Sequence, residues 1–282
     1  MRPPPQARIV APEFPHELSW LGVAFLRMDR LLGQGAVLVE FFDSARINSL
    51  RTLPYLRAWH ERYAARGLRV VGVHTPGYSF GTDPEYVARA VERLAVPYPV
   101  LLDPDYVMWR LYGNEGWPAR YLFDHRGILR YQHYGEGDYL DAELAVQEIL
   151  SEIADDGERM PAPMEPLRAE DAPGALLEPQ TPEVVLPADR ARLELVRDWI
   201  DGPDYIEAED AGAAALLTYS GAGAFAVLSG GGLEPGLYET DGRIVAEDPG
   251  VRLHAVQFTP MAPAPRAPTP RPSAPGGSPW EA

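Results

Sequence analysis

The 282-residue sequence has no cysteine and no lysine. Without cysteine, the chain can form no disulfide, present no thiolate nucleophile and hold no metal ion through sulfur. Without lysine, it has no P-loop for nucleotide phosphates, because that motif requires a lysine beside its glycines. Composition alone therefore excludes thiol redox chemistry and P-loop nucleotide chemistry.

Long apolar runs are also missing. A membrane-spanning helix needs roughly 20 consecutive apolar residues, and no stretch of this sequence approaches that length. The first residues, MRPPPQARIVAPEFP, lack the continuous apolar core of a secretory signal. We therefore expect a cytoplasmic protein that makes no contact with a membrane.

The net charge of −16 is concentrated in the second half of the chain. Residues 1–150 carry 16 arginines and 18 acidic residues, whereas residues 151–258 carry 7 arginines and 22 acidic residues. A segment with this excess of negative charge repels phosphate backbones, so we expect no nucleic-acid partner. The simplest interpretation of the acidity is a solvated surface.

Strand-like and helix-like patterns alternate between residues 36 and 153, which is typical of an α/β fold. The predicted strands are Ala36–Phe42, Leu68–His74, Pro99–Leu102, Ala119–Phe123 and Ile128–Tyr134. The predicted helices are Ile47–Arg66, Pro84–Leu94, Tyr106–Tyr112 and Tyr139–Ile153. The turn DHRG joins the last two strands as a hairpin, so the central sheet is expected to be mixed.

The pattern changes after residue 153. A stretch rich in Pro, Asp and Glu predicts a linker, and its TPEVVLP segment could be the first strand of a second module. Short apolar runs between Gly and Asp turns then predict a small all-β sandwich, and a Pro/Ala/Gly-rich end predicts disorder. The predicted boundaries are 1–34 (N-terminal segment), 35–153 (α/β domain), 154–192 (linker), 193–258 (β module) and 259–282 (disordered tail).

The stretch FFDSARINSLRTLPYL, residues 41–56, joins a strand to a helix through a short polar turn. A dithiol enzyme of this layout has cysteines three positions apart, the first at the helix N-terminus, where the helix dipole stabilises a thiolate. Arg46 and Ser49 stand at these two positions. A serine nucleophile needs an adjacent base, but His60, the nearest histidine in sequence, lies three helical turns away. We expect Ser49 to be a polar residue of the first helical turn.

The segment VLVEFFDSARINSLRTLPYLRAWHERYAARGLRVVGVHTP resembles the TlpA-like branch of the thioredoxin superfamily, whose active-site turn is similar to S-C-I-N-C-L-R-T-L-P-Y-L. The resemblance places the two family cysteines on Arg46 and Ser49 and the residues between them on Ile47 and Asn48. It places the proline that kinks the active-site helix on Pro54. This resemblance implies a thioredoxin fold in which the reacting residues have been replaced.

A second segment, EGWPARYLFDHRGILRYQHYGEGDY, is similar to the cis-proline strand and hairpin of the same family. This similarity places the cis-proline on Pro118, directly after Trp117. With APEFPHELSWL, which resembles the segment preceding this domain in such proteins, the resemblance covers about residues 11–153.

The second half of the chain resembles a shortened form of the β-rich, carbohydrate-binding-like module that follows the thioredoxin-like domain in DipZ-type members. The segments GAFAVLSGGG and GLYETDGRIVAEDPGVRLHAVQFT carry this resemblance. Sugar binding would need aromatic platforms, and the available aromatic residues could equally belong to the core. They are Trp199, Tyr205, Tyr219 and Tyr238.

Other candidate sites are weaker. The six histidines show no HxH or HxxxH spacing, so we expect no zinc site. We expect His74, at the end of a predicted strand, to be a solvated strand-end residue, although a functional role there is an alternative. The acidic stretch RDWIDGPDYIEAED lacks the EF-hand pattern but could form a surface calcium site of another kind. No cofactor is expected.

These features lead to three hypotheses. The first is a redox-inactive pseudo-enzyme whose groove, formed by Arg46, Ile47, Asn48, Trp117 and Pro118, binds a protein or peptide partner, with Arg46 favouring a carboxylate. The second is an enzyme without thiols, for which no catalytic pair is evident. The third is an assembly subunit that contacts partners through the acidic β module and the tail. A family label would read thiol-disulfide oxidoreductase, which the residues do not support.

Overall fold

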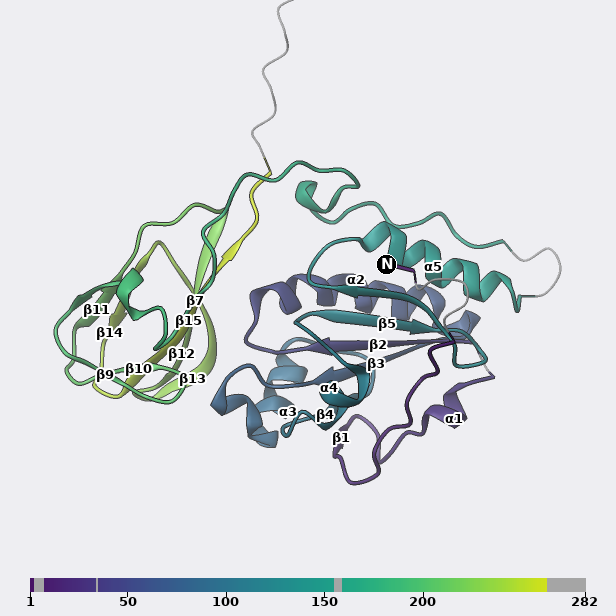
Figure 1. The fold of residues 1–282 in the computed structure, drawn as a ribbon, viewed down its shortest axis with the longest axis horizontal. Coiled ribbons are helices and arrows are strands. Elements are labelled where there is room, and N and C mark those ends of the chain that lie inside the picture. Colours follow the sequence, from purple (N-terminus) through teal and green to yellow (C-terminus); the bar gives the residue numbers. More distant parts are fainter. Residues whose placement is uncertain (3–7, 34, 155–158, 263–282) are drawn as a thin grey trace, which may run out of the picture.

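The computed structural model describes residues 1–2, 8–33, 35–154 and 159–262. It contains an α/β domain and an all-β module, joined by a long extended segment that passes over the α/β domain (Figure 1). The predicted tail lies almost wholly outside the described residues.

The α/β domain is built on a six-stranded sheet with the strand order β1-β4-β3-β2-β5-β6. Its strands are β1 (Trp20–Leu21), β2 (Ala36–Phe42), β3 (Leu68–His74), β4 (Val100–Leu102), β5 (Ala119–Phe123) and β6 (Leu129–Tyr134). Its helices are α1 (Met28–Leu31), α2 (Ile47–Tyr63), α3 (Pro84–Arg93), α4 (Val107–Tyr112) and α5 (Tyr139–Ser151). Strands β2, β3 and β4 are parallel, and the other pairs are antiparallel, so the predicted mixed sheet and α/β fold are confirmed.

Several elements begin or end one or two residues from their predicted bounds, and two further details differ from the sequence prediction. Helix α2 stops as an α-helix at Tyr63 and continues to Arg66 as a 3₁₀ turn, because Gly67 takes a left-handed conformation and ends the helix. Strand β1 was not predicted, since it has only two residues inside a Pro-rich stretch. It pairs with β4 at the edge of the sheet.

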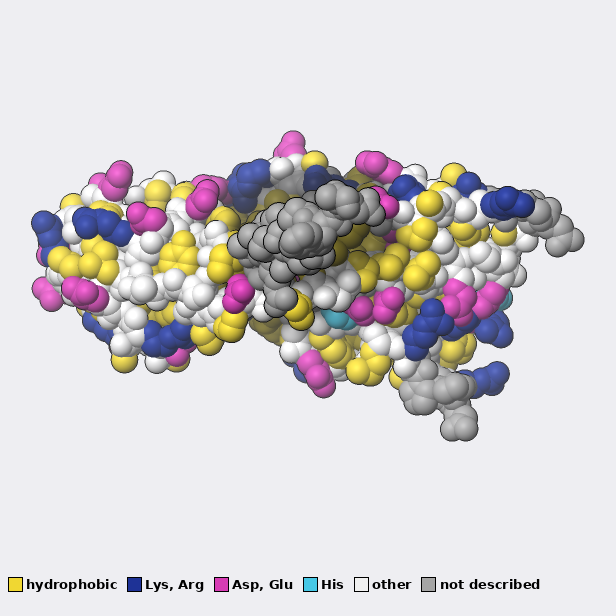
Figure 2. Space-filling model, turned by 90° about the horizontal axis from the view of Figure 1, so that it is seen from above, with side chains coloured by type: hydrophobic (Ala, Val, Ile, Leu, Met, Phe, Trp, Pro, Cys, Tyr) yellow, Lys and Arg dark blue, Asp and Glu magenta, His cyan; other side chains and the backbone are white. Residues whose placement is uncertain are grey.

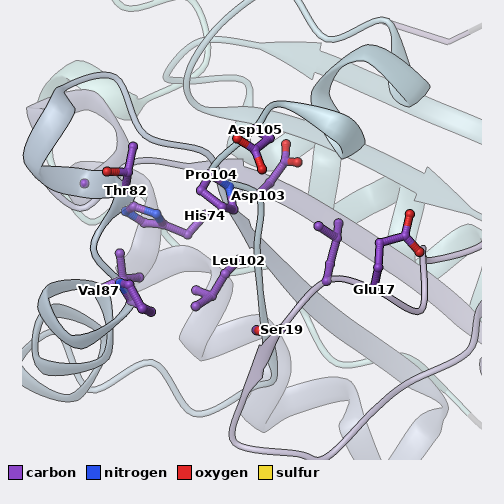
Figure 3. Close-up of a pocket in the computed structure, with 12 residues that line it drawn as sticks. Glu17, Ser19, His74, Thr82, Val87, Leu102, Asp103, Pro104 and Asp105 are labelled. Carbon is purple, nitrogen blue, oxygen red and sulfur yellow. The ribbon is translucent and has the colours of Figure 1, made fainter.

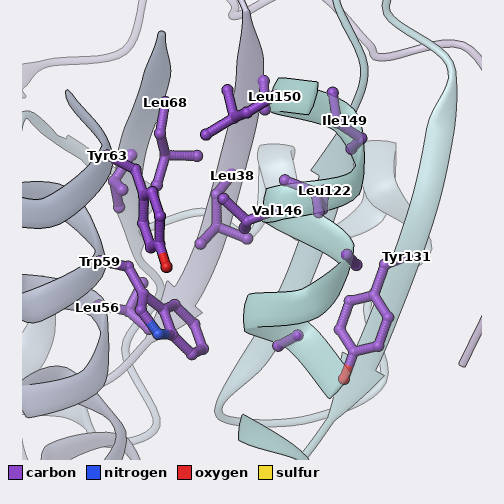
Figure 4. Packing of buried hydrophobic residues seen from close by; sticks show 14 of the residues in the cluster. Leu38, Leu56, Trp59, Tyr63, Leu68, Leu122, Tyr131, Val146, Ile149 and Leu150 are labelled. Atoms are coloured by element: carbon purple, nitrogen blue, oxygen red, sulfur yellow. The ribbon is translucent and has the colours of Figure 1, made fainter. Parts of the chain in front are cut away.

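The core between α2, α5 and the sheet rests on large aromatic side chains. Trp59 and Tyr63 of α2 are fully buried and face Val146 and Ile149 of α5 (Figure 4). Leu38 of β2 lies beneath them. A fully buried side chain of this size contributes about 1.5–3 kcal/mol or more, so these contacts fix α2, and with it the turn at its N-terminus, against the sheet.

Strand β2 is buried on both faces, as expected for the central strand of an α/β sheet. Alternate residues face opposite sides. Leu38 belongs to the cluster under α2 and α5, whereas Val39 and Phe41 belong to a second cluster beneath the N-terminal segment and α4. The turn that follows β2 is therefore anchored in the centre of the domain.

The β module consists of two antiparallel sheets around one apolar core. One sheet has the order β13-β12-β15-β10-β9, with β7 also paired to β15, and the other has the order β14-β11-β8. The strands are β7 (Val184–Val185), β8 (Glu194–Val196), β9 (Trp199–Asp201), β10 (Ile206–Ala208), β11 (Ala213–Leu216), β12 (Gly223–Gly230), β13 (Leu233–Thr240), β14 (Arg243–Ala246) and β15 (Val251–Thr259). Strand β7 lies in the TPEVVLP segment, where the sequence suggested a first strand.

Charge on the molecular surface is mixed. Acidic side chains occur over both halves of the visible face, with arginines between them, and do not form one continuous patch (Figure 2). No α-helix in the described ranges has both the length and the apolar content that a bilayer crossing requires.

Strand β2 carries one fully buried carboxyl group. Glu40 of β2 is fully buried opposite Arg120 of β5, and neither of its side-chain oxygens has a hydrogen-bond partner among the described residues. Burial raises the pKa of Glu40 to about 8, although the charge of Arg120 opposes this rise. The folded protein therefore keeps this proton at neutral pH, whereas the unfolded chain releases it near its ordinary pKa.

This difference predicts a pH dependence of stability. Between the unfolded pKa and about 8, the folded state binds more protons at Glu40, so its contribution falls as pH rises. We expect Glu40→Gln to reduce the loss of unfolding free energy between pH 5 and pH 8, by an amount on the order of a few kcal/mol. Urea unfolding at both pH values measures this, with the exposed Glu61→Gln as control. Equal pH dependence in Glu40→Gln and wild type would contradict the prediction.

Candidate functional site

In the turn between β2 and α2, Arg46 and Ser49 both have structural partners. Arg46 is the N-cap residue of α2, and its side chain does not cap the helix. Ser49 is fully buried, and its hydroxyl accepts a hydrogen bond from the backbone N–H of Asp43 at 3.2 Å. Among the described residues, no histidine hydrogen-bonds to the Ser49 hydroxyl, so no base there activates it as a nucleophile.

The Arg46 guanidinium points out of the α/β domain and meets the β module. Its Nη1 atom donates to both carboxylate oxygens of Glu183, each at 3.2 Å. The guanidinium also lies over the rings of Trp117 and Tyr78, 4.5 and 5.2 Å from their centroids. Only 19% of the Arg46 side chain is exposed, so this cation is held by one carboxylate and two aromatic faces.

The electrostatic balance at Arg46 favours its charged form. Burial by itself lowers the pKa of the guanidinium, but Tyr78, Glu183 and Asp43 together raise it above its ordinary value. A permanent cation at a helix N-terminus is unfavourable in isolation. Glu183 supplies the compensating anion.

Gln257 of β15 makes the second contact between the β module and the turn. Its Oε1 atom accepts from the backbone N–H of Ile47 at 2.7 Å, and its Nε2 atom donates to the carbonyl of Ala45 at 3.2 Å. Nε2 also donates to the Tyr78 hydroxyl at 2.7 Å, and that hydroxyl donates to Glu183 at 3.2 Å. Side chains of the α/β domain and of the β module thus form a continuous hydrogen-bonded network over the turn.

The remaining groove residues border this network. The peptide bond between Trp117 and Pro118 is cis. The Trp117 indole N–H donates to the carbonyl of Thr75 at 2.9 Å, while Pro118 is buried. Asn48 is exposed, and together with Arg46, Ile47, Trp117, Glu183 and Gln257 it lines a cavity of about 70 Å³ between the two bodies.

Gly77 makes room for this arrangement. A Cβ atom on Gly77 would lie 2.7 Å from Arg46 Nε and 2.7 Å from Asp43 Oδ2. The backbone of the loop after β3 therefore approaches the Arg46 side chain more closely than any residue with a side chain allows without a shift.

The docking of the β module extends beyond Arg46. Asp204 accepts hydrogen bonds from the backbone N–H and the hydroxyl of Ser79, at 2.7 and 3.1 Å. His254 Nδ1 lies 3.0 Å from the Asp204 carbonyl oxygen, and His254 Nε2 lies 2.7 Å from the Ser229 hydroxyl. Burial raises the pKa of Asp204, but the hydrogen bonds of His254 and Ser79 outweigh this and lower it. This carboxylate is therefore stabilised in its docked, ionised form.

A small apolar cluster completes the contact. It combines Ala45 and Tyr78 of the α/β domain with Val227 and Ala255 of the β module, all buried. At the outer edge of the docked surfaces, Arg89 donates to Glu234 at 3.2 Å.

The prediction of a solvated His74 is wrong, because only 1% of this residue is exposed. Its Nε2 atom lies 3.3 Å from the Ser44 backbone N–H and 3.1 Å from the Ser44 hydroxyl. Burial lowers the pKa of His74, and the contacts of its ring with Ser44 tie the turn to the end of β3. Ser44 is also buried, and its hydroxyl donates to the Tyr86 hydroxyl at 3.3 Å.

His74 also lines a cavity of about 200 Å³ at the ends of β3 and β4 (Figure 3). Asp103 is the buried carboxylate in this cavity. It accepts hydrogen bonds from the backbone N–H groups of Met108 and Trp109 and from the Thr75 hydroxyl, at 2.9–3.0 Å. These bonds hold the start of α4, so the group is already used by the fold.

The aromatic candidates for sugar binding in the β module have structural contacts. Trp199 is buried in the core, and Tyr219 and Tyr238 pack against it. Tyr205 lies beneath the guanidinium of Arg252. In the part of the chain that the structure describes, no group of three or more His, Asp or Glu side chains could hold a metal ion.

The turn was predictable from the sequence, but the side chains that cover it, those of Glu183, Gln257 and Tyr78, were not. Glu183 lies in an acidic linker among many carboxylates, and Gln257 lies in a strand whose outward face could not be assigned without the sheet register. Tyr78 follows β3 in a loop with no motif of its own. Only the unusual cation at Arg46 pointed to the need for a carboxylate.

Comparisons with known proteins agree with the fold. Residues 26–132 match the AhpC/TSA family. Protein DipZ of Mycobacterium bovis is 36% identical over 174 residues, which cover 61% of this chain and 25% of that protein. The thiol-disulfide oxidoreductase YkuV of Bacillus subtilis is 27% identical over 141 residues, covering 50% of this chain and 94% of that protein. The chain thus spans only about a quarter of the length of DipZ.

Among solved structures, a thiol-disulfide isomerase from Corynebacterium glutamicum superimposes with a TM-score of 0.45 at 22% sequence identity, covering 50% of this chain and 97% of that chain. The family match and the identity with DipZ confirm the resemblance to the thioredoxin superfamily and to DipZ-type proteins. Residues 26–132 thus lie in a thioredoxin-like domain that matches the AhpC/TSA family, and the sequence contains no cysteine.

Proposed function

We propose that this protein is a redox-inactive, thioredoxin-fold binding protein in which the former active-site turn is a docking surface for a carboxylate-bearing protein segment. The observation that carries the proposal is the Arg46 side chain, which stands at the first cysteine position and binds Glu183 between two aromatic rings. Relatives such as YkuV are named thiol-disulfide oxidoreductases. This chain has no sulfur nucleophile with which to act as one.

Three features of the turn suit it to binding. The guanidinium recognises a carboxylate. The backbone N–H of Ile47 and carbonyl of Ala45 recognise an amide, as their hydrogen bonds with Gln257 illustrate. Trp117 and Tyr78 supply flat apolar faces that exclude water from the ion pair and strengthen it. In the folded chain, the β module occupies these three features, so the turn joins the α/β domain to the β module.

An assembly role for the acidic β module is the second candidate. Residues 151–258 carry most of the net negative charge. Several of these carboxylates, among them Asp198, Glu209 and Asp210, are exposed. Deleting residues 193–282 and recovering every binding partner would exclude this second role.

The proposal requires that the protein has no thiol redox activity. In the insulin-reduction assay with dithiothreitol, the wild-type protein is expected to give no rate above the blank, because thiolate attack and disulfide exchange both need cysteine. A clear catalytic rate would contradict the proposal.

The proposal also requires that the β module docks through Arg46. Because the chain has no native cysteine, Glu61→Cys and Asp248→Cys, both at exposed positions, allow one dye on each body. We expect a narrow distribution of energy-transfer efficiencies between the two dyes in the wild type and a broad one in Arg46→Glu. The substitution places a second carboxylate beside that of Glu183, and the two repel each other. The fold should survive, because Glu is favoured at a helix N-terminus.

The matched control is Arg110→Glu, which makes the same charge change at an exposed position on α4. It is expected to leave the energy-transfer distribution unchanged. If Arg46→Glu also leaves the distribution unchanged, the turn is not the docking surface and the proposed function fails.

A further inference from the structure

We propose that the β module is a releasable occupant of the Arg46 turn, and that the turn, once uncovered, binds an extended acidic peptide of a partner protein in its place. This inference rests on the proposed function and adds the class of partner and the means of regulation.

The class of partner follows from the groups that occupy the turn in the closed chain. The side-chain carboxamide of Gln257 has the same donor and acceptor as a backbone peptide unit, and it pairs with Ile47 N–H and the Ala45 carbonyl. Glu183 adds one carboxylate. An extended peptide with an Asp or Glu side chain presents both groups from one strand.

The internal occupant leaves part of Arg46 unused. Both hydrogen bonds to Glu183 come from Nη1 alone, so the internal carboxylate does not engage two nitrogens of the guanidinium. A carboxylate that meets the guanidinium through two nitrogens forms the stronger, forked pair. A peptide carboxylate that is free to orient itself can therefore compete with Glu183 for this cation.

The linker is divided in a way that permits release. Its first part is bound to the α/β domain: Glu170 accepts from Arg51 at 2.9 Å, and Asp171 accepts from the Tyr55 hydroxyl at 2.7 Å. Its last part is bound to the β module: Glu178 N–H donates to the Met261 carbonyl, and Thr181 N–H donates to the Ser220 carbonyl, at 2.9 and 2.8 Å.

Between these parts lies a hinge, residues 172–177. Among the described residues, its backbone hydrogen bonds are local, within residues 169–175. Leu176 and Leu177 are 77% and 50% exposed, and Gly174 has a left-handed conformation. Six residues span at most about 20 Å, and rotation about their backbone bonds can carry the β module away from the turn while both ends of the linker stay in place.

The surface that would separate is mixed in character. Its apolar part is the small cluster around Tyr78 and Val227, and the rest consists of ion pairs and hydrogen bonds such as Asp204 with Ser79. Contacts of this type resemble transient interfaces more than a domain core. The tether gives the β module an effective concentration in the millimolar range, so the closed chain masks the turn until the contacts are weakened.

The test uses fluorescence anisotropy with a labelled peptide, Gly-Val-Glu-Val-Gly with blocked ends, and its Glu→Gln counterpart. The opened variant is Glu183→Ala combined with Gln257→Ala, which alters only the occupant and leaves every residue of the turn intact. Because the apparent affinity scales with the open fraction, we expect the opened variant to bind the acidic peptide at least tenfold more tightly than wild type. The Gln peptide should bind at least tenfold more weakly.

Each outcome decides the inference. Equal affinity of wild type and the opened variant for the acidic peptide would overturn it, as would equal affinity of the opened variant for both peptides. Added Arg46→Glu must abolish the gain. If the two-dye chain shows that the opened variant remains docked, the occupant is not released through these contacts and the inference also fails. Docking that depends on Arg46 without any peptide binding would leave the proposed function standing and overturn only this extension.

Discussion

The positive charge of Arg46 at the N-terminus of α2 is the constraint on which the arrangement of the two bodies depends. The first turn of a helix already carries the positive end of the dipole, so a guanidinium there needs an anion. Residues near the turn offer Asp43, but its carboxylate already accepts hydrogen bonds from the backbone N–H groups of Ala45 and Gly77. Glu183, which lies 137 positions away in sequence, supplies the anion and brings the β module with it. The charge of Arg46 thus accounts for one of the contacts that join the two domains.

The same charge affects what the turn presents to other molecules. A dithiol centre must stay accessible to its substrates, whereas this turn is covered by Gln257 and Glu183. In the proposed function, the turn holds a protein segment, and the β module is the first segment that it holds.

The elements of the α/β domain were predictable because their signals are local. The apolar run of β2, the helix from Ile47 and the Asp124–Gly127 turn each follow from a few neighbouring residues, and the predicted strands Ala36–Phe42, Leu68–His74 and Ala119–Phe123 have the observed bounds. The burial of His74 was not predictable, because it depends on residues distant in sequence, such as Ser44, that pack against its ring. The role of Glu183 and Gln257 was hidden for the same reason: it depends on how two domains dock, and a single sequence has no local pattern for that.

The central claim is that Arg46 and Glu183 act together to hold the β module on the turn. A double-mutant cycle of Arg46→Ala, Glu183→Ala and the combined variant, with the docking free energy taken from the populations of docked and released chains, tests it most directly. The account predicts a coupling energy of about 1 kcal/mol or more, as expected for a partly buried ion pair with stacked aromatic rings. Effects that add to within about 0.3 kcal/mol would contradict it.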